Sequence, residues 1–175
     1  MSNSNLTVNC SNRIEKTLFD FCEKVLEPNK IDFLIVGSLA LKKLGMECDE
    51  PHDIDMEVIC TSEQEKIFKL LSDSRNNDFY ETDEKIGYLS KAERRMDKVT
   101  WSKKPYIFEW CGVLINIWVV SEFSHPYITL QNGINYAQIM SVIRKKIAYN
   151  RQKDMRFLIR LATRFLKMCE VSESD

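Results

Sequence analysis

The strongest constraint on this chain is the alternation of acidic and apolar residues between Asp53 and Ile59. A repeat of two is the period of a β-strand, because successive side chains of a strand point to opposite faces. One face would carry Asp53, Asp55 and Glu57, and the other Ile54, Met56 and Val58. Neighbouring carboxylates on one face repel each other and lose hydration, so a cation between them is expected. The segment therefore predicts a strand that presents a candidate metal site.

A strand, a sharp turn and a short helix are predicted directly before this acidic strand. The apolar run Phe33–Val36 has the length of a buried strand, and Gly37-Ser38 interrupts it. Residues 38–44 have apolar side chains at helical spacing, with Ser38 as the predicted N-cap and Gly45 as the end of the helix. A strand that leads through glycine into a helix exposes backbone N–H groups, which bind phosphate. A phosphate site beside metal-binding carboxylates is typical of phosphoryl or nucleotidyl transfer.

A simpler interpretation is that Asp53 and Asp55 lie on an edge strand and only face solvent. An Asp-x-Asp pair on its own favours that interpretation. The preceding strand, Gly-Ser turn and short helix favour the functional one, because they place a phosphate site next to the carboxylates.

Two segments, Val36-Gly37-Ser38 and His52-Asp53-Ile54-Asp55-Met56, together resemble the nucleotidyltransferase superfamily in its small, minimal branch. In that family a Gly-Ser or Gly-Gly turn precedes a hydrophobic-Asp-hydrophobic-Asp strand. The resemblance implies an α+β fold with a mixed sheet and flanking helices. It implies that Asp53 and Asp55 hold two Mg²⁺ (or Mn²⁺) ions, and that Gly37 and Ser38 bind the phosphates of a nucleoside triphosphate.

The resemblance extends weakly to the C-terminal part of the chain. Lys146 and the segment Arg151-Gln152-Lys153-Asp154 are similar to a basic RxKD segment of many members. Lys146, Arg151 and Lys153 are therefore candidate ligands of the triphosphate.

The third metal carboxylate of the family normally lies on a later strand, within a hydrophobic-Asp-hydrophobic pattern. The corresponding pattern in this chain is Ile115-Asn116-Ile117. An amide oxygen is a neutral ligand, so Asn116 puts full catalysis in doubt. Glu57, on the acidic strand, is one alternative third ligand.

The other alternative, Glu109, depends on the register of a predicted hairpin. The strands Tyr106–Trp110 and Val113–Val120 flank the turn Cys111-Gly112. With a two-residue turn, Ile107 would oppose Asn116 and Glu109 would oppose Leu114. Glu109 would then lie on the same face as Asn116.

The 175 residues, 44% hydrophobic and 29% charged, are typical of one globular domain. Residues 1–11 are polar and are expected to form a disordered tail before a domain of residues 12–175. No apolar run reaches membrane-spanning length and no signal peptide is visible, so we expect a cytoplasmic protein with no membrane partner. The six cysteines form no Cys-x-x-Cys pair and are expected to be reduced, which disfavours a zinc site.

Amphipathic patterns predict four further helices, over Asn12–Leu26, from Ser62 onward, over Tyr136–Tyr149 and over Asp154–Cys169. A capping box from Ser62 to Glu65 would begin the second of these. Its predicted inner face is Ile67, Phe68, Leu70 and Leu71, and that of the third helix is Ile139, Met140, Ile143 and Ile147. A short strand and turn are expected over Ile128–Gly133. Residues 75–104 show no clear period apart from a possible strand near Lys98–Trp101.

The last helix combines an apolar stripe with a basic face. The stripe comprises Met155, Leu158, Ile159, Ala162, Phe165, Leu166 and Cys169, and the opposite side carries Arg156, Arg160, Arg164 and Lys167. The basic face has two interpretations, a solvated surface or a site for a polyanion.

The sequence thus predicts a metal-dependent nucleotidyltransferase that moves a nucleoside monophosphate from a triphosphate to a hydroxyl acceptor. The basic helix tilts the expected acceptor towards a macromolecule, RNA or protein. One rival is a catalytically silent copy of the fold that binds a nucleotide or a partner protein, with Asn116 as its main support. A second rival is a plain interaction domain with an acidic strand.

Overall fold

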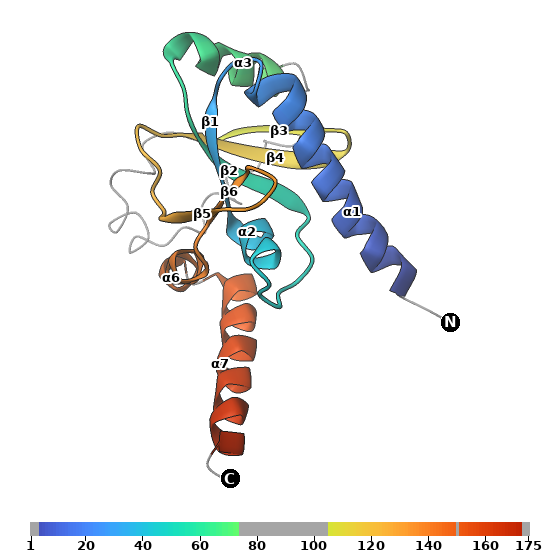
Figure 1. Ribbon diagram of the computed structural model, residues 1–175, viewed down its shortest axis with the longest axis vertical. Coiled ribbons are helices and arrows are strands. Elements are labelled where there is room, and N and C mark those ends of the chain that lie inside the picture. Colours follow the sequence, from blue (N-terminus) through green and yellow to red (C-terminus); the bar gives the residue numbers. More distant parts are fainter. Residues whose placement is uncertain (1–3, 74–104, 150, 173–175) are drawn as a thin grey trace.

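The computed structural model describes residues 4–73, 105–149 and 151–172, and within them six strands form one mixed sheet (Figure 1). The strands are β1 (Asp32–Val36), β2 (Asp53–Ile59), β3 (Tyr106–Trp110), β4 (Val113–Val119), β5 (Tyr127–Thr129) and β6 (Asn135–Ala137). Their order in the sheet is β3-β4-β2-β1-β6-β5. The β2–β4 and β1–β6 pairs are parallel and the other pairs are antiparallel. The sheet and its helices confirm the predicted α+β class.

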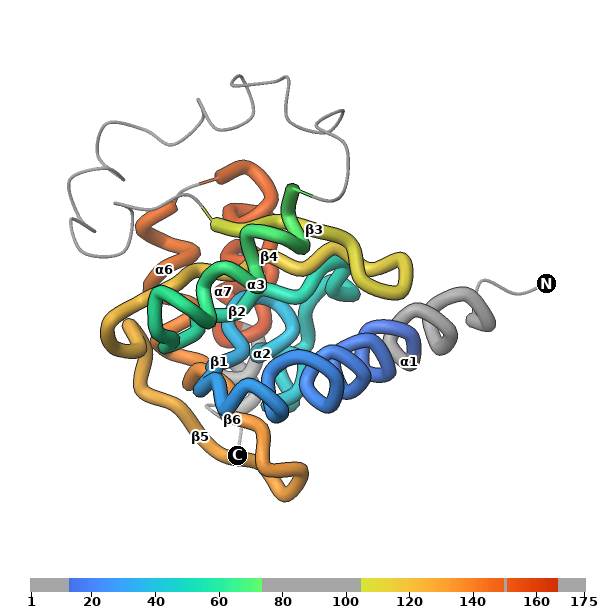
Figure 2. The backbone as a smooth tube through the Cα atoms, turned by 90° about the horizontal axis from the view of Figure 1, so that it is seen from above, coloured from blue at the N-terminus to red at the C-terminus, as the bar shows by residue number. Residues whose placement is uncertain are grey.

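The structure describes five α-helices beside this sheet. They are α1 (Ser4–Phe21), α2 (Gly37–Lys43), α3 (Ser62–Asp73), α6 (Ile139–Tyr149) and α7 (Gln152–Ser172). The π-helix η1 (Cys22–Leu26) continues α1. Figure 2 shows α1 along one side of the molecule and α6 on the other.

The apolar face of the sheet packs against α1 and α3. Ile54, Met56 and Val58 of β2 are fully buried, as their alternation predicts. The ring of Phe21, at the end of α1, contacts the ring of Phe108 on β3 at a centroid distance of 5.6 Å. Burying each of these side chains contributes about 1.5–3 kcal/mol. This half of the core holds β2 in place, so its other face is free to carry polar groups.

The opposite face of β2, which carries Asp53, Asp55 and Glu57, lies towards α2 and α6. β1 occupies the centre of the sheet, and its last three residues, Leu34, Ile35 and Val36, are buried. In the antiparallel register Val36 pairs with Asp55. The turn that follows β1 therefore lies beside the acidic end of β2.

Several helix starts differ from the predictions. The first helix begins at Ser4 rather than at Asn12. Val36, not Ser38, is the N-cap of α2, and no side chain caps that helix. Gly45 follows α2 in the left-handed region, with φ of 83°, as expected for a residue that ends a helix.

The reciprocal capping interactions of α3 involve the pair one residue before the predicted one. Thr61 N–H donates to Gln64 Oε1 at 2.7 Å, and Gln64 N–H donates to Thr61 Oγ1 at 3.3 Å. The box is therefore Thr61 to Gln64, not Ser62 to Glu65. Phe68 is the one residue of α3 that is buried, and Leu70, predicted to face inward, is 69% exposed.

The hairpin and its register are as predicted, and so are the short strand β5 and the turn after it, whereas the predicted start of the next helix is wrong. Ile107 pairs with Asn116 and Glu109 with Leu114. Residues 135–137 form the strand β6 instead of the start of a helix, because they pair with both β1 and β5. The expected strand near Lys98–Trp101 lies outside the described residues.

The inner face of α6 was predicted correctly for Ile143 and for the partly buried Ile139, but wrongly for two other residues. Its buried residues are Val142, Ile143 and Lys146, while Met140 and Ile147 are exposed. A purely apolar pattern cannot anticipate this rotation, because the group that turns inward is a lysine with a buried acidic partner.

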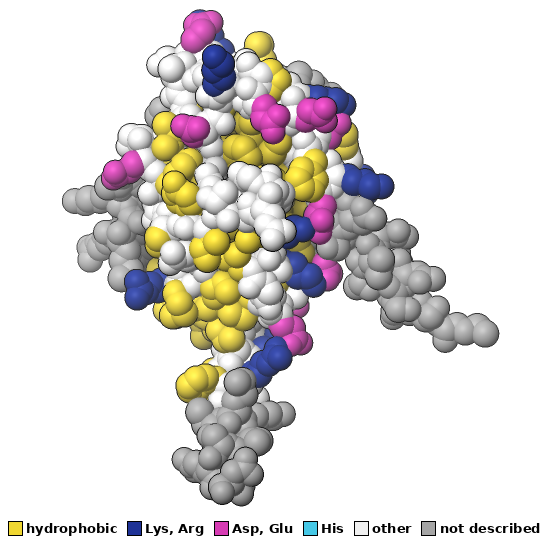
Figure 3. All heavy atoms as spheres, in the orientation of Figure 1, with side chains coloured by type: hydrophobic (Ala, Val, Ile, Leu, Met, Phe, Trp, Pro, Cys, Tyr) yellow, Lys and Arg dark blue, Asp and Glu magenta, His cyan; other side chains and the backbone are white. Residues whose placement is uncertain are grey.

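The apolar stripe of α7 is also largely exposed. Phe157 is buried and Leu158 and Leu161 are partly buried, but Ile159 is 60% exposed. In Figure 1 the C-terminal part of α7 extends away from the sheet. Figure 3 shows apolar side chains on the surface near the start of this helix. Among the side chains of α6 and α7 that the structure describes, the exposed large apolar ones are Met140, Ile147, Met155, Ile159, Phe165 and Leu166.

Candidate functional site

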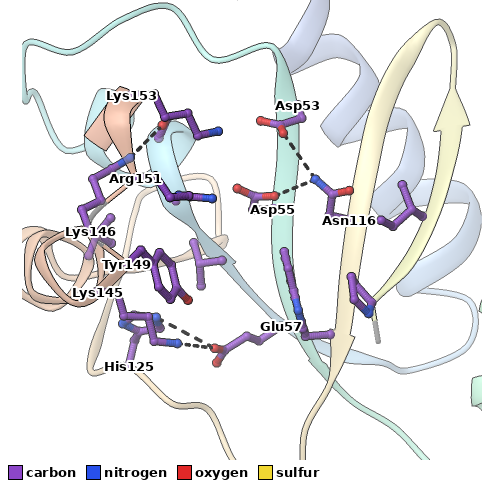
Figure 4. A pocket seen from close by; sticks show the side chains of 17 residues that line it. Asp53, Asp55, Glu57, Asn116, His125, Lys145, Lys146, Tyr149, Arg151 and Lys153 are labelled. Atoms are coloured by element: carbon purple, nitrogen blue, oxygen red, sulfur yellow. Dashed lines mark hydrogen bonds and ion pairs between the residues drawn. The ribbon is translucent and has the colours of Figure 1, made fainter. Parts of the chain in front are cut away.

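The acidic end of β2 brings two carboxylates and one amide together. Asp55 pairs with Asn116 in the parallel β2–β4 register. Asn116 Nδ2 donates to Asp55 Oδ1 at 2.8 Å and to Asp53 Oδ2 at 3.3 Å (Figure 4). The three residues predicted from Asp-x-Asp and from the third-ligand position are therefore in direct contact.

Gly37 lies against the second oxygen of Asp55. A Cβ atom at Gly37 would be only 2.6 Å from Asp55 Oδ2. The φ of Gly37 is 69°, a conformation that glycine adopts without the strain that a side chain would cause. The glycine is thus required both for the turn out of β1 and for the close approach of the carboxylate.

The surroundings of Asp55 disfavour its negative charge. Burial, followed by repulsion from Asp53, raises the pKa of Asp55 to about 6. The Asn116 hydrogen bond and the positive charges of Lys153 and Arg151 act in the opposite direction. A carboxylate held in this way gains from a nearby cation, because a cation offsets both the burial and the repulsion.

A buried ion cluster holds the basic residues in front of the carboxylates. Lys146 Nζ donates to Asp154 Oδ1 at 2.9 Å and lies 3.5 Å from Ser38 Oγ. Arg151 Nε donates to Asp154 Oδ2. Asp154 is 1% exposed. Burial acts to raise the pKa of Asp154, but the hydrogen bonds from Arg151 and Lys146 together hold it below its usual value.

These groups line one cavity of about 270 Å³. Figure 4 shows Asp53, Asp55 and Asn116 facing Lys153, Arg151 and Lys146 across it. Eight of the nine predicted site residues line it: Gly37, Ser38, Asp53, Asp55, Asn116, Lys146, Arg151 and Lys153. A negative wall on the sheet thus faces a positive wall at the junction of α6 and α7.

The ninth residue, Glu109, lies outside this set. It pairs with Leu114, which in turn pairs with Asp53, so two strand spacings, about 10 Å, separate Glu109 from Asp53. Glu109 is exposed and does not line the cavity. The prediction that Glu109 completes the metal site is not supported by this geometry.

Glu57 lines the cavity but is engaged elsewhere. Its Oε2 accepts the backbone N–H of Ser124 at 2.8 Å, and its Oε1 accepts the Ser124 hydroxyl. Lys145 Nζ is 3.4 Å from the same Oε1, and His125 Nε2 is 3.9 Å from it. These partners direct the carboxylate of Glu57 away from a shared site with Asp53 and Asp55.

The sequence alone did not identify Trp118, His125, Lys145 and Tyr149, which also line the cavity. Trp118 could have been found from the hairpin register, since it lies two residues beyond Asn116 on the same face. His125 lies in the loop before β5, and Lys145 and Tyr149 lie on α6, whose orientation the apolar pattern did not predict.

The residues present suit one Mg²⁺ ion better than two. Within residues 4–73, 105–149 and 151–172, no group of three or more His, Cys, Asp and Glu side chains is placed to hold a metal ion. Asp53 and Asp55 supply two charged oxygen ligands, and Mg²⁺ is commonly bound by one or two carboxylates together with substrate phosphates. The donor set therefore fits a Mg²⁺ ion that binds with a triphosphate.

Comparisons of the chain with models of protein families, with curated proteins and with solved structures find no match. None of the described helices is long and apolar enough to cross a membrane. The functional argument therefore depends on the cavity and on the motif that forms it.

Proposed function

We propose that this protein is a metal-dependent nucleotidyltransferase that moves a nucleoside monophosphate from a triphosphate to a hydroxyl acceptor. One observation carries the proposal: the buried carboxylate of Asp55 lies beside Asp53 and against Gly37, in a cavity whose opposite wall is basic. A pair of carboxylates that faces a wall of basic side chains is complementary to a metal–triphosphate complex, whose cation would meet the carboxylates and whose phosphate oxygens would meet the basic side chains.

The acidic wall and the basic wall of the cavity would bind different parts of the metal–triphosphate complex. Asp53 and Asp55 would hold Mg²⁺ (or Mn²⁺), which neutralises charge on the attacking and leaving oxygens of an in-line displacement. Lys146, Arg151 and Lys153 would bind the triphosphate oxygens, together with the backbone at Gly37 and Ser38. The Lys146 and Arg151 side chains are fixed by Asp154, so little conformational entropy is lost when they bind phosphate.

The acceptor is less well supported. Two of the basic residues on α7 already have acidic partners: Arg160 contacts Asp49 at 2.8 Å, and Arg164 pairs with Glu47. The basic face of α7 therefore lends less support to an RNA acceptor than the sequence suggested. RNA and protein acceptors both stay within the proposal.

The alternative is a catalytically silent protein that uses the same cavity to bind a nucleotide or a partner protein. Asn116 favours it, because its amide group already satisfies both carboxylates and brings no charge to a second metal ion. The nucleotide-binding form of this alternative also predicts binding of a Mg²⁺–triphosphate complex, and only the transferase predicts turnover.

Calorimetric titration with ATP, with and without Mg²⁺, tests binding, and transfer from labelled nucleotide tests turnover. Asp53→Asn and Asp55→Asn should abolish the Mg²⁺-dependent binding and any transfer. Asp32→Asn is the matched control, because it removes the same charge from an exposed carboxylate at the far end of β1, outside this cavity. Binding that is equal in the presence and absence of Mg²⁺, or transfer that survives either site substitution, would refute the assignment.

A further inference from the structure

The cavity continues along β2 beyond the two aspartates. Glu57 follows Asp55 on the same face, about 7 Å further along the strand. In the β2–β4 register Glu57 pairs with Trp118, as Asp55 pairs with Asn116. The cavity floor thus consists of two neighbouring rows, one with the proposed metal ligands and one with a large aromatic ring.

A second aromatic ring lines this cavity from α6. Figure 4 shows Tyr149 on the side opposite β2, between Arg151 and the pair Lys145 and His125. The guanidinium carbon of Arg151 lies 4.9 Å from the centre of the Tyr149 ring. Because Arg151 is also bound to Asp154, the Tyr149 ring is linked to the ion cluster at the proposed triphosphate site.

Charged groups complete this end of the cavity. Glu57 is 2% exposed, yet its side chain is an ion-pair partner of Lys145. His125 is also buried and lines the cavity, and its Nδ1 contacts Ser141 Oγ. The Lys145 ammonium, which Glu57 holds beside the two aromatic rings, provides a donor for the edge of a planar heterocycle.

We propose that the end of the cavity formed by Trp118, Tyr149, Glu57 and Lys145 binds the nucleobase of the triphosphate. The base stacks on Trp118 and Tyr149, and its polar edge meets Lys145, which Glu57 holds in place. The inference rests on the proposed function, because it requires the phosphates at the Asp55 end. It adds that the nucleoside part, not only the phosphate chain, contributes to binding.

The test compares two kinds of probe in the presence of Mg²⁺. One kind is the four common nucleoside triphosphates, each measured separately, and the other is inorganic tripolyphosphate. Stacking on an aromatic side chain contributes enough that its loss weakens binding by about 5- to 150-fold. Trp118→Leu and Tyr149→Leu should therefore each weaken nucleoside triphosphate binding by a factor in this range and leave tripolyphosphate binding unchanged. Trp118→Phe, which keeps a ring, should retain most of the affinity.

Tyr127→Leu is the matched control, because Tyr127 is an exposed aromatic residue on β5 that does not line the cavity. Circular dichroism establishes that each variant is folded, and Tyr149→Leu carries the test where Trp118→Leu does not fold.

The outcomes separate the two proposals. Wild-type protein that binds tripolyphosphate as tightly as every nucleoside triphosphate would overturn the nucleobase site alone. Equal losses for both probes in Trp118→Leu and Tyr149→Leu would do the same, since the rings would then act on the phosphate end. Failure to bind either probe would overturn the proposed function and this inference together.

Discussion

Replacing Asp55 with Asn should stabilise the metal-free protein at neutral pH. Burial, and then repulsion from Asp53, raises the pKa of Asp55 from 3.8 to about 6. A carboxyl whose pKa is higher in the folded chain than in the unfolded chain stabilises the fold while it is protonated. That contribution is complete below the unfolded pKa and is lost as the pH rises through about 6.

The size of the effect follows from the two pKa values. The difference between 3.8 and about 6 corresponds to about 3 kcal/mol. Asparagine cannot ionise, and its side-chain oxygen can still accept the hydrogen bond from Asn116. We therefore expect Asp55→Asn to raise the free energy of unfolding by up to about 3 kcal/mol at a pH of about 7.5, and by about 1 kcal/mol at a pH of about 4.5.

Urea denaturation at these two pH values, with a chelator present, measures the difference. Asp49→Asn serves as the control, because its exposed ion pair with Arg160 contributes at most about 1 kcal/mol. Adding Mg²⁺ and ATP should stabilise the wild type and not Asp55→Asn. A substitution that stabilises the protein equally at both pH values, or destabilises it at neutral pH, would show that Asp55 carries no burial cost.

Three further predictions concern the same cavity. Asp154→Asn should lower the free energy of unfolding by about 3–5 kcal/mol in urea denaturation, because it leaves buried Lys146 without its carboxylate partner. A loss below about 1 kcal/mol would mean that the ion cluster around Asp154 is solvated. Gly37→Ala should destabilise the protein by more than Gly45→Ala. Both glycines have a positive φ, but only at Gly37 would a Cβ lie 2.6 Å from a carboxylate oxygen. Equal losses of stability in thermal unfolding would argue against this close contact. Asn116→Asp should tighten Mg²⁺ binding in calorimetry and lower metal-free stability, and unchanged Mg²⁺ affinity would exclude Asn116 from the metal site.

The elements with a strict period of two were predictable from the sequence. The alternation in β2 gave both its faces correctly, and the two-residue turn fixed the pairing of Ile107 with Asn116. Both depend on local geometry, since the strand period and the turn length determine which side chains share a face. The convergence of Asp53, Asp55 and Gly37 followed from these elements and the motif.

The helix orientations were not predictable in the same way. The pattern placed Met140 and Ile147 inside, but α6 turns Lys146 inward because Asp154, eight residues later, offers it a buried partner. An apolar periodicity carries no information about such an ion pair. The stripe of α7 was also predicted wrongly, since among its described side chains only those of the first turns, around Phe157, are buried or partly buried.

The network around Glu57 at one end of the cavity was missed because it depends on long-range contacts. Glu57 was considered as a metal ligand from its place on β2, yet its contacts with Ser124 and Lys145 come from residues far along the chain. Nothing in the local sequence marks that network.

Asn116 has opposite consequences for the site with and without a cation. As a donor, its amide group bonds to both carboxylates and lowers the pKa of Asp55, which stabilises the pair when no metal is bound. To become a metal ligand, the amide must present its oxygen instead, and the N–H groups then turn away from both carboxylates. A cation must therefore replace two hydrogen bonds as well as offset two charges. An aspartate in this position would favour the metal-bound state and destabilise the metal-free one. The asparagine suits a site in which the metal ion binds together with a triphosphate, whose oxygens supply the charge that the third residue does not.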